Sequence, residues 1–274
     1  LIIGASGFIG ANILKKCLEI RDDVTGTVFS GDSWRLVGIP AFNIAYLNIQ
    51  DPISILSLLH RIKPRTIFDC SSFGAYSFEQ DFERIHATNY LSFIRMMEEM
   101  ADIEVSAYIH AGSSSEYGMN AAAPAEGDPM APNSHYAVSK AAASQAITYF
   151  GKVRGLPVAN LRLYSVYGPY EDSSRLIPQL CEHSLRGKLP KLARPEASRD
   201  FVYVDDVVAA FVDAALGMSP AIAGESFNIG SGLRTTLSAL ASLAQNVFSI
   251  TDEPQFDPKV SRPWDVDKWW ADAR

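Results

Sequence analysis

The stretch LIIGASGFIG, residues 1–10, runs from an apolar strand through a glycine-rich turn into a helix. Gly4 can supply the turn, Gly7 lets the backbone approach a pyrophosphate, and Gly10 allows the helix to pack closely on the strand. The N-terminus of the helix adds N–H groups and the positive end of a dipole. The spacing G-x-x-G-x-x-G is a weak signal by itself, but its place between a strand and a helix predicts a dinucleotide-binding site.

Strand and helix signals alternate along the chain that follows, as is typical of βαβ units. A chain of 274 residues of which 47% are hydrophobic can bury a large core. We therefore predict an α/β fold built on a doubly wound, Rossmann-like parallel sheet. Further strands are expected at residues 24–29, 42–47, 66–70 and 105–111, and a helix at residues 52–62 with Pro52 in its first turn.

Composition argues against several classes of function. The net charge is −7 and no run is rich in lysine or arginine, so neither a nucleic acid nor an anionic membrane is expected as a partner. No apolar run reaches the roughly 18 residues that a membrane helix needs. Cys17, Cys70 and Cys181 form no C-x-x-C pair and the histidines show no H-E-x-x-H spacing, so no disulfide or metal site is expected. A reducing, cytoplasmic location fits this pattern. The chain opens inside a strand without a methionine, so we expect a residue or two upstream.

The end of the second strand bears on the choice between NAD and NADP. An acidic residue about 20 positions after the glycine turn would hold the ribose 2′-hydroxyl of NAD. The strand ends instead in Phe29 and Ser30, and the first acid, Asp32, lies beyond Gly31. Because no carboxylate repels a 2′-phosphate there, Ser30 and Arg35 could hold one, which slightly favours NADP. The alternative is that Arg35 is a solvated loop residue.

Two later strands are also followed by candidate ligand loops. Asn48 and Ile49 come after the third expected strand, and Cys70, Ser71 and Ser72 come after the fourth. Open α/β sheets bind their ligands at the carboxyl ends of parallel strands. Both segments are therefore expected to contact the cofactor.

Tyr136 and Lys140 are four residues apart in the stretch SHYAVSK. On a helix this spacing places both side chains on one face, so that they can reach into one pocket. A tyrosine phenol titrates near pH ~10, and a neighbouring cation favours the phenolate. Tyr136 is therefore a candidate acid/base. Taken alone, Y-x-x-x-K is more often part of an ordinary amphipathic helix.

Three consecutive serines, Ser113, Ser114 and Ser115, follow the strand expected at residues 105–111. A hydroxyl at this edge of the sheet could donate a hydrogen bond to a substrate oxygen beside Tyr136. A serine cluster after a strand is more often an ordinary loop.

Taken together, these motifs resemble the extended short-chain dehydrogenase/reductase family, in particular its nucleotide-sugar epimerase/dehydratase branch. Each motif is weak, but their order and spacing are specific and cover essentially the whole chain. The motifs are the glycine turn, the serine segment ending in YG (117–118), YAVSK (136–140), RLYSVYGP (162–169), RDFVYVDD (199–206), FNIGSG (227–232) and RPWD (262–265).

The resemblance implies roles for the residues that match it. Tyr136 would be the catalytic acid/base, and Lys140 would bind the nicotinamide ribose and lower the pKa of the tyrosine. Ser113, four residues before Tyr117, would polarise the reacting oxygen. Further cofactor contacts are implied for Phe8, Ile9, Asn89, Tyr164 and Val166, and substrate contacts for Ser114, Ser115, Ser165, Arg175, Arg199 and Arg262.

Two arginines of that set would hold the diphosphate of the nucleotide. Arg199 and Arg262 match family arginines of this role, which suits the forked guanidinium. The alternative is that they pair with the nearby carboxylates of Asp200 and Asp265.

Two domains are also implied. Residues 1–168, with about 200–232, would form the dinucleotide-binding domain. Residues 169–199 and 233–274 would form a smaller, mostly helical substrate domain over the strand ends.

A homodimer is implied through the helices near residues 89–100 and 136–150. The first carries Phe93 within a stripe of methionines, which is typical of a core or a subunit interface. The second carries small residues that let helices approach closely, at Ala141, Ala142, Ala143 and Ala146.

Two departures from the family pattern bear on the reaction. Family 4,6-dehydratases place an acid pair, or a Glu, directly after the catalytic hydroxyl, where this chain has Ser114 and Ser115. Glu116 would reach that position only with a shift of one residue. Ser165 stands where the family usually has Asn, which weakens one expected substrate contact.

We therefore expect hydride transfer at C4 of a nucleotide-diphosphate sugar, by a 4-epimerase or a 4-ketoreductase. Dehydration or decarboxylation of the same substrates is an alternative. A steroid- or flavonoid-type reductase is less favoured, because such an enzyme has no need for Arg199 and Arg262. A non-catalytic, cofactor-sensing protein is also possible on this fold, although such proteins tend to lose the tyrosine and the lysine.

Overall fold

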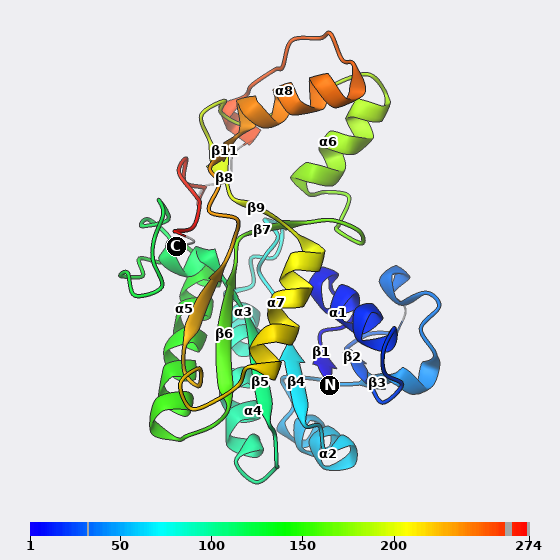
Figure 1. The fold of residues 1–274 in the computed structure, drawn as a ribbon, viewed down its shortest axis with the longest axis vertical. Helices are drawn as coiled ribbons and strands as arrows, with labels where there is room; N and C mark the ends of the chain where they lie inside the picture. Colours follow the sequence, from blue (N-terminus) through cyan, green and yellow to red (C-terminus); the bar gives the residue numbers. More distant parts are fainter. Residues whose placement is uncertain (32, 261–264, 273–274) are drawn as a thin grey trace.

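The computed structural model describes residues 1–31, 33–260 and 265–272. Its largest feature is a seven-stranded sheet in the order β10-β6-β5-β4-β1-β2-β3, with parallel neighbours throughout (Figure 1). The predicted α/β fold with a parallel sheet is thereby confirmed. The strands are β1 (Ile2–Ile3), β2 (Gly26–Val28), β3 (Ile44–Tyr46), β4 (Thr66–Asp69), β5 (Ala107–Ser113), β6 (Val158–Leu163) and β10 (Ser226–Ile229).

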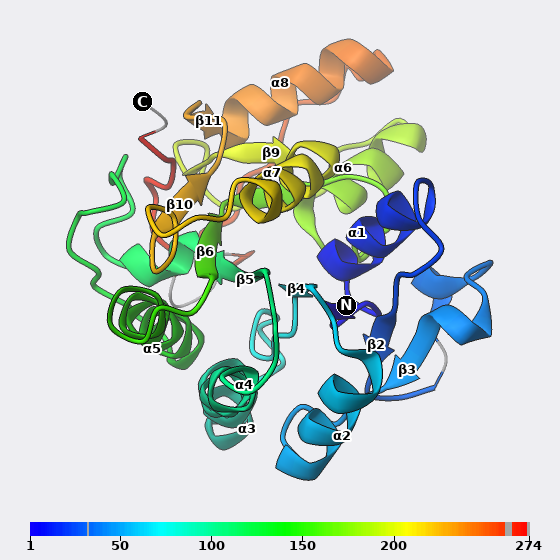
Figure 2. The same cartoon turned by 60° about the horizontal axis from the view of Figure 1, so that its bottom comes forward.

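Helices cover both faces of the sheet, and each face has its own buried apolar cluster (Figure 2). Ile13 and Phe211 belong to the cluster on one face, and Phe93 and Ile147 belong to the cluster on the other. Burial of these amphipathic helix faces is what fixes the helices on the sheet. The first face carries α1 (Phe8–Leu18) and α7 (Val204–Leu216), and the second carries α2 (Pro52–Ile62), α4 (Ser92–Met100) and α5 (His135–Thr148).

Two helices on the second face are longer than predicted, because each continues through a π-helical turn. The helix α3 (Phe82–His86) runs through a π turn at Ala87–Leu91 into α4, and α5 runs into a π turn at Tyr149–Val153. The methionine stripe of α4 is buried in the core together with Phe93. It is therefore part of the packing of this chain.

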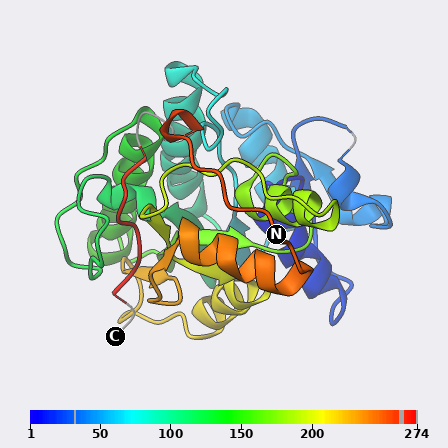
Figure 3. The ribbon, with the colours of Figure 1, turned by 90° about the horizontal axis from the view of Figure 1, so that it is seen from above.

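A small layer of two helices lies above the carboxyl ends of the strands (Figures 1 and 3). We call this the α6–α8 layer. Its buried residues, among them Leu180, Leu192 and Leu240, form a third apolar cluster. The layer consists of α6 (Leu176–Leu185) and α8 (Leu237–Phe248), joined to the sheet through the strand pairs β7 (Ser165–Tyr167) with β9 (Phe201–Tyr203) and β8 (Ser198–Arg199) with β11 (Thr235–Thr236).

Strand ends differ from the prediction in one place that matters for the site. The prediction ended β5 at Ala111, but the strand continues because Gly112 and Ser113 pair with Arg162 and Leu163 of β6. Ser113 is therefore the last residue of a buried strand, which fixes its backbone more firmly than a loop would.

Among the helices within the described ranges, none is long and apolar enough to cross a membrane.

Candidate active site

A cavity of about 980 Å³ lies between the carboxyl edge of the large sheet and the α6–α8 layer. Leu176, Leu192 and Leu237 line its upper side. Ligand sites of proteins typically measure about 300–1,000 Å³, so there is room for a large ligand. The predicted site residues that line the cavity are Gly7, Phe8, Ile9, Arg35, Cys70, Ser72, Ser113, Ser114, Ser115, Tyr136, Lys140, Tyr164, Ser165, Val166, Arg175 and Arg199.

Other predicted residues lie away from this cavity. Phe29 and Ser30 are exposed at the end of β2, and Asn48 and Ile49 follow β3. None of these four is among the described residues that line the cavity. Their contacts with a cofactor stay predictions. Arg262 falls outside the described residues.

The glycine turn has the shape that close approach of a phosphate requires. Gly4 has φ +76°, and a Cβ atom there would lie 2.9 Å from the backbone of Cys70. A Cβ atom on Gly10 would lie 2.4 Å from the carbonyl oxygen of Gly4, so only glycine lets α1 pack this closely. Gly7 is the N-cap residue of α1 and provides no side-chain cap, which leaves the first N–H groups available to an anion. The turn therefore fits the pyrophosphate of a dinucleotide.

Tyr136 and Lys140 both line the cavity, as their spacing predicts. The hydroxyl of Ser134 caps α5 by accepting a hydrogen bond from the N–H of Ala137 at 3.1 Å. This sets the start of the helix and places Tyr136 in its first turn, half-buried in the cavity wall. Lys140 is only 1% exposed, and its Nζ donates to the carbonyl oxygen of Ala111 at 2.9 Å. The ammonium group is thus fixed against the backbone of β5.

Ser113 and Ser114 differ in how their hydroxyls are engaged. The Oγ of Ser113 accepts a hydrogen bond from the N–H of Ser115 at 3.1 Å, so its own proton is the group left to donate. The Oγ of Ser114 accepts a hydrogen bond from Nε1 of Trp269 at 2.9 Å. Both residues line the cavity, and Ser114 joins its wall to the C-terminal segment.

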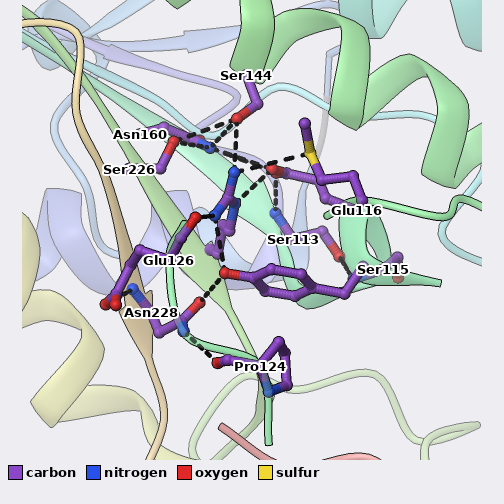
Figure 4. Close-up of polar contacts among 12 residues, drawn as sticks. Ser113, Ser115, Glu116, Pro124, Glu126, Ser144, Asn160, Ser226 and Asn228 are labelled. Carbon is purple, nitrogen blue, oxygen red and sulfur yellow. Dashed lines mark hydrogen bonds and ion pairs between the residues drawn. The ribbon is translucent and has the colours of Figure 1, made fainter. Parts of the chain in front are cut away.

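Glu116 lies in a buried polar network with Ser113, Asn160 and Arg162 (Figure 4). It is fully buried, and its Oε2 pairs with Nε of Arg162 at 2.7 Å. Its Oε1 accepts a hydrogen bond from the N–H of Ser113 at 3.0 Å. Arg162 also donates to the hydroxyl of Tyr117 at 2.7 Å, and that hydroxyl donates to Asn228 at 2.9 Å. Glu116 therefore holds the backbone of Ser113 in place.

Two buried polar side chains hold the loop that follows β4. One carboxylate oxygen of Asp69 accepts hydrogen bonds from the N–H of Ser71 at 3.0 Å and from its hydroxyl at 2.6 Å. The amide of Asn89 bonds both the N–H and the carbonyl oxygen of Phe73, and it donates to Ser139 of α5 at 2.9 Å. Asn89 and Ser71 thus support the cavity wall from behind.

Asp69 supports the loop beside the site and was missed by the sequence analysis. Its second carboxylate oxygen accepts hydrogen bonds from Tyr108 at 2.7 Å and from Nδ1 of His110 at 3.1 Å. Burial opposes ionisation of Asp69, but these bonds and those from Ser71 outweigh it and hold the pKa of the carboxyl at about 2. Burial also lowers the pKa of His110, so its ring is neutral at pH 7. An acidic residue ending a buried strand was the available signal.

Arg199 lines the cavity and is already paired. Its Nη2 lies 3.0 Å from Oδ1 of Asp265, and its Nη1 donates to the carbonyl oxygens of Ser198 and Val266. Burial lowers the pKa of the Arg199 guanidinium, although it stays charged at pH 7. The carboxylate of Asp200 instead accepts hydrogen bonds from Ser231 and Gly232, which follow β10, and from the N–H of Ala271 in the C-terminal segment. The predicted alternative for Arg199, a pair with Asp265, is what the structure shows.

Glu171 is a cavity residue that the sequence analysis missed. It lines the cavity, and its buried Oε2 has no hydrogen-bond partner within the described ranges. Burial raises the pKa of its carboxyl from 4.5 to about 7, against the opposing effect of Arg175. The side chain therefore changes charge near neutral pH.

Glu171 should make the stability of the ligand-free protein fall as the pH rises. Because its pKa is raised on folding, its contribution is complete below pH 4.5 and is lost as the pH passes about 7. Glu171→Gln cannot ionise, so at pH 8 we expect it to exceed wild type by about 1 kcal/mol, or about 2 °C in Tm, after allowance for partial solvent screening. Thermal unfolding from pH 4 to 8.5 tests this. Glu182→Gln, in an exposed pair with Arg186, is the control, and parallel curves for wild type and Glu171→Gln would contradict the assignment.

Comparison with known proteins identifies the family to which this chain belongs. Residues 1–230 match the family described as NAD dependent epimerase/dehydratase. A UDP-glucose 4-epimerase of Mycolicibacterium smegmatis is 30% identical over 270 residues, which cover 94% of this chain and 85% of that protein.

Two solved structures show the same fold over nearly the whole chain. A UDP-glucose 4-epimerase of Thermotoga maritima, solved with UDP-glucose, has a TM-score of 0.86 at 26% identity, covering 99% of this chain and 88% of that one. MoeE5, solved with UDP-glucose and NAD, has a TM-score of 0.82 at 26% identity, covering 100% and 89%. The chain described here belongs to the NAD dependent epimerase/dehydratase family.

Proposed function

We propose that this chain is a 4-epimerase that acts on a nucleotide-diphosphate sugar with a resident nicotinamide cofactor. The observation that carries the proposal is that Ser113, Tyr136 and Lys140 line one cavity together with the glycine turn. The similarity to UDP-glucose 4-epimerases supports the choice of reaction. In this proposal residues 1–168, with about 200–232, bind the cofactor, and residues 169–199 and 233–274 bind the sugar nucleotide.

The bound nicotinamide would supply the acceptor and donor of the hydride at C4, and the chain supplies the rest. Lys140, fixed by the carbonyl oxygen of Ala111, lies one helical turn from Tyr136 on α5 and would bind the nicotinamide ribose. Tyr136 can then take the proton of the sugar 4-hydroxyl and later return it. Ser113 would donate its hydroxyl proton to the same oxygen, while Glu116 holds its backbone in place.

Dehydration is less favoured by the geometry. The positions after Ser113 where a dehydratase would carry acids hold Ser114 and Ser115, and Glu116 is bound in the ion pair with Arg162. A carboxylate in that pair has no access to the cavity.

We further propose NAD as the cofactor, in place of the slight preference for NADP predicted from the sequence. Arg35 already donates to the carbonyl oxygens of Tyr170 and Ser6, and its guanidinium lies 4.0 Å from the carboxylate of Asp172. A 2′-phosphate would have to displace these partners and approach that carboxylate. The complex of MoeE5 with NAD agrees with this choice. Tighter binding of NADPH than of NADH in a fluorescence titration would refute it.

Arg199 is proposed to contact the diphosphate of the substrate. A charge-assisted hydrogen bond contributes about 1.5–3 kcal/mol, so Arg199→Ala should weaken UDP binding at least tenfold. Calorimetric titration with UDP, dTDP, CDP and GDP measures the effect. Asp265→Asn is the matched control, because it keeps the arginine and should bind at least as tightly as wild type. Equal affinity of Arg199→Ala and wild type would remove Arg199 from this role.

A homodimer through α4 and α5 is also proposed, with a cytoplasmic location. The methionine stripe of α4 is buried in the core, so contacts would fall to the exposed apolar groups of this face, such as Leu91, Val138 and Tyr149. A monomer in sedimentation at micromolar concentration would contradict the dimer.

A further inference from the structure

A short segment between β7 and α6, residues 168–172, lies against the glycine turn and α1. We call it the strap; its sequence is GPYED. Nδ2 of Asn12, on α1, donates to the carbonyl oxygen of Pro169 at 3.0 Å and to that of Phe8 at 2.9 Å. A side chain of α1, the helix that follows the glycine turn, thus binds the strap directly.

Arg35 forms a second attachment between the strap and the glycine turn. Its Nε donates to the carbonyl oxygen of Tyr170 at 2.8 Å, and its Nη1 donates to that of Ser6, within the turn, at 3.4 Å. Its Nη2 lies 4.0 Å from Oδ2 of Asp172. The Arg35 side chain is only 12% exposed, so solvent competes little for these contacts. One guanidinium therefore joins the strap to the turn.

The strap backbone is held in an uncommon conformation. Tyr170 has φ +69°, in the left-handed region that side chains other than glycine seldom adopt. Its ring lies 6.2 Å from that of Trp34, and Nζ of Lys15 lies 4.7 Å above it. Such a conformation persists only where surrounding contacts impose it, and the bonds from Asn12 and Arg35 to the strap backbone are among those contacts.

The strap and the glycine turn belong to one cavity. Gly7, Phe8 and Ile9 line it from the turn, and Glu171 and Asp172 line it from the strap. A dinucleotide whose pyrophosphate binds at the N-terminus of α1 would therefore lie beside the strap.

We propose that Asn12 and Arg35 are positioning residues that fasten the strap to the glycine turn and so control how slowly a bound dinucleotide leaves. The inference rests on the proposed epimerase, which must return the hydride that it has taken and therefore needs a cofactor that stays through turnover. A fastened strap keeps the cofactor side of the cavity closed between the two hydride transfers.

The rate of NADH dissociation tests the proposal. Protein loaded with NADH is mixed with excess NAD in a stopped-flow instrument, and the loss of NADH fluorescence gives the rate constant. Arg35→Lys keeps the charge but loses the planar fork that reaches Tyr170, Ser6 and Asp172, and Asn12→Ala removes the bond to Pro169. We expect each variant to release NADH at least tenfold faster than wild type, with little change in Tm.

Arg21→Lys is the matched control, because Arg21 pairs with Asp23 in a fully exposed ion pair on the same half of the chain. It should release NADH at the wild-type rate. The proposal would be overturned if wild type, Arg35→Lys and Asn12→Ala released NADH at equal rates. It would also be overturned if the control released NADH as fast as either variant, or if wild type failed to bind NADH. The release experiment contains no sugar, so its result does not depend on epimerisation. If wild type releases NADH slowly but epimerises no sugar, the proposed function is refuted and the role of the strap stands.

Discussion

Replacing Tyr136 by phenylalanine is expected to lower kcat for 4-epimerisation by about 10²–10⁴-fold, the usual contribution of a positioned acid/base. The ring keeps its place in the first turn of α5, and Lys140 keeps its bond to the carbonyl oxygen of Ala111. Only the route of the proton between the sugar 4-hydroxyl and the protein is lost. NADH affinity and Tm should therefore change little.

The matched control for this variant is Tyr149→Phe. Tyr149 lies at the far end of the same continuous helix and is 46% exposed, so loss of its hydroxyl should leave kcat within twofold of wild type. The comparison separates the chemistry of the Tyr136 phenol from a general effect of removing a hydroxyl. Activity of Tyr136→Phe within tenfold of wild type would show that another group transfers the proton.

Glu116→Gln is expected to have the largest effect on stability. The change leaves the Arg162 guanidinium buried without its carboxylate, and breaking a buried pair on one side costs about 3–5 kcal/mol. It also weakens the bond to the N–H of Ser113, so activity should fall as well. Urea unfolding of the variant and of wild type gives the change in the free energy of unfolding.

Two further variants make this prediction specific. Glu116→Gln combined with Arg162→Met removes both charges, so it should recover much of the stability that the single variant loses. Glu182→Gln breaks the exposed pair with Arg186 and should cost at most about 1 kcal/mol. A loss no greater for Glu116→Gln than for Glu182→Gln would mean that the buried pair does not stabilise the fold.

Features that depend only on short, local sequence patterns were predicted correctly. The i, i+4 spacing of Tyr136 and Lys140 requires only that the segment be helical, and both residues line the cavity. The glycine turn follows from local backbone geometry, since Gly4 needs a positive φ and Gly10 a close approach. The bounds of α2, with Pro52 at its first residue, agree with the prediction for the same reason.

Features that depend on partners far apart in sequence were not predicted. Glu116 meets Arg162 46 residues away, and Asp69 meets His110 41 residues away, because neighbouring parallel strands bring them together. No local pattern marks such a pair. Glu171 looks like an ordinary loop acid in the sequence, and only the cavity around it reveals its raised pKa.

Arg35 shows how a correct residue can receive an incomplete role. The sequence identified it as a cation near the cofactor, and the structure does place it in the cavity wall. Its partners are Ser6 in the turn and Tyr170 and Asp172 in the strap, and Tyr170 lies 135 residues from Arg35 along the chain. The sequence alone could not tell a free guanidinium from one that is already bound.

The most direct test of the proposed function follows a deuterium atom at C4 of the sugar. The purified protein is incubated with UDP-, dTDP-, CDP- and GDP-glucose that carry deuterium at C4, and the products are identified by NMR. We expect at least one of them to yield the 4-epimer with deuterium still at C4, because the hydride taken from the sugar is the one returned. Absence of an epimer from every substrate, or an epimer that carries hydrogen from solvent at C4, would contradict hydride transfer at C4 as the reaction of this protein.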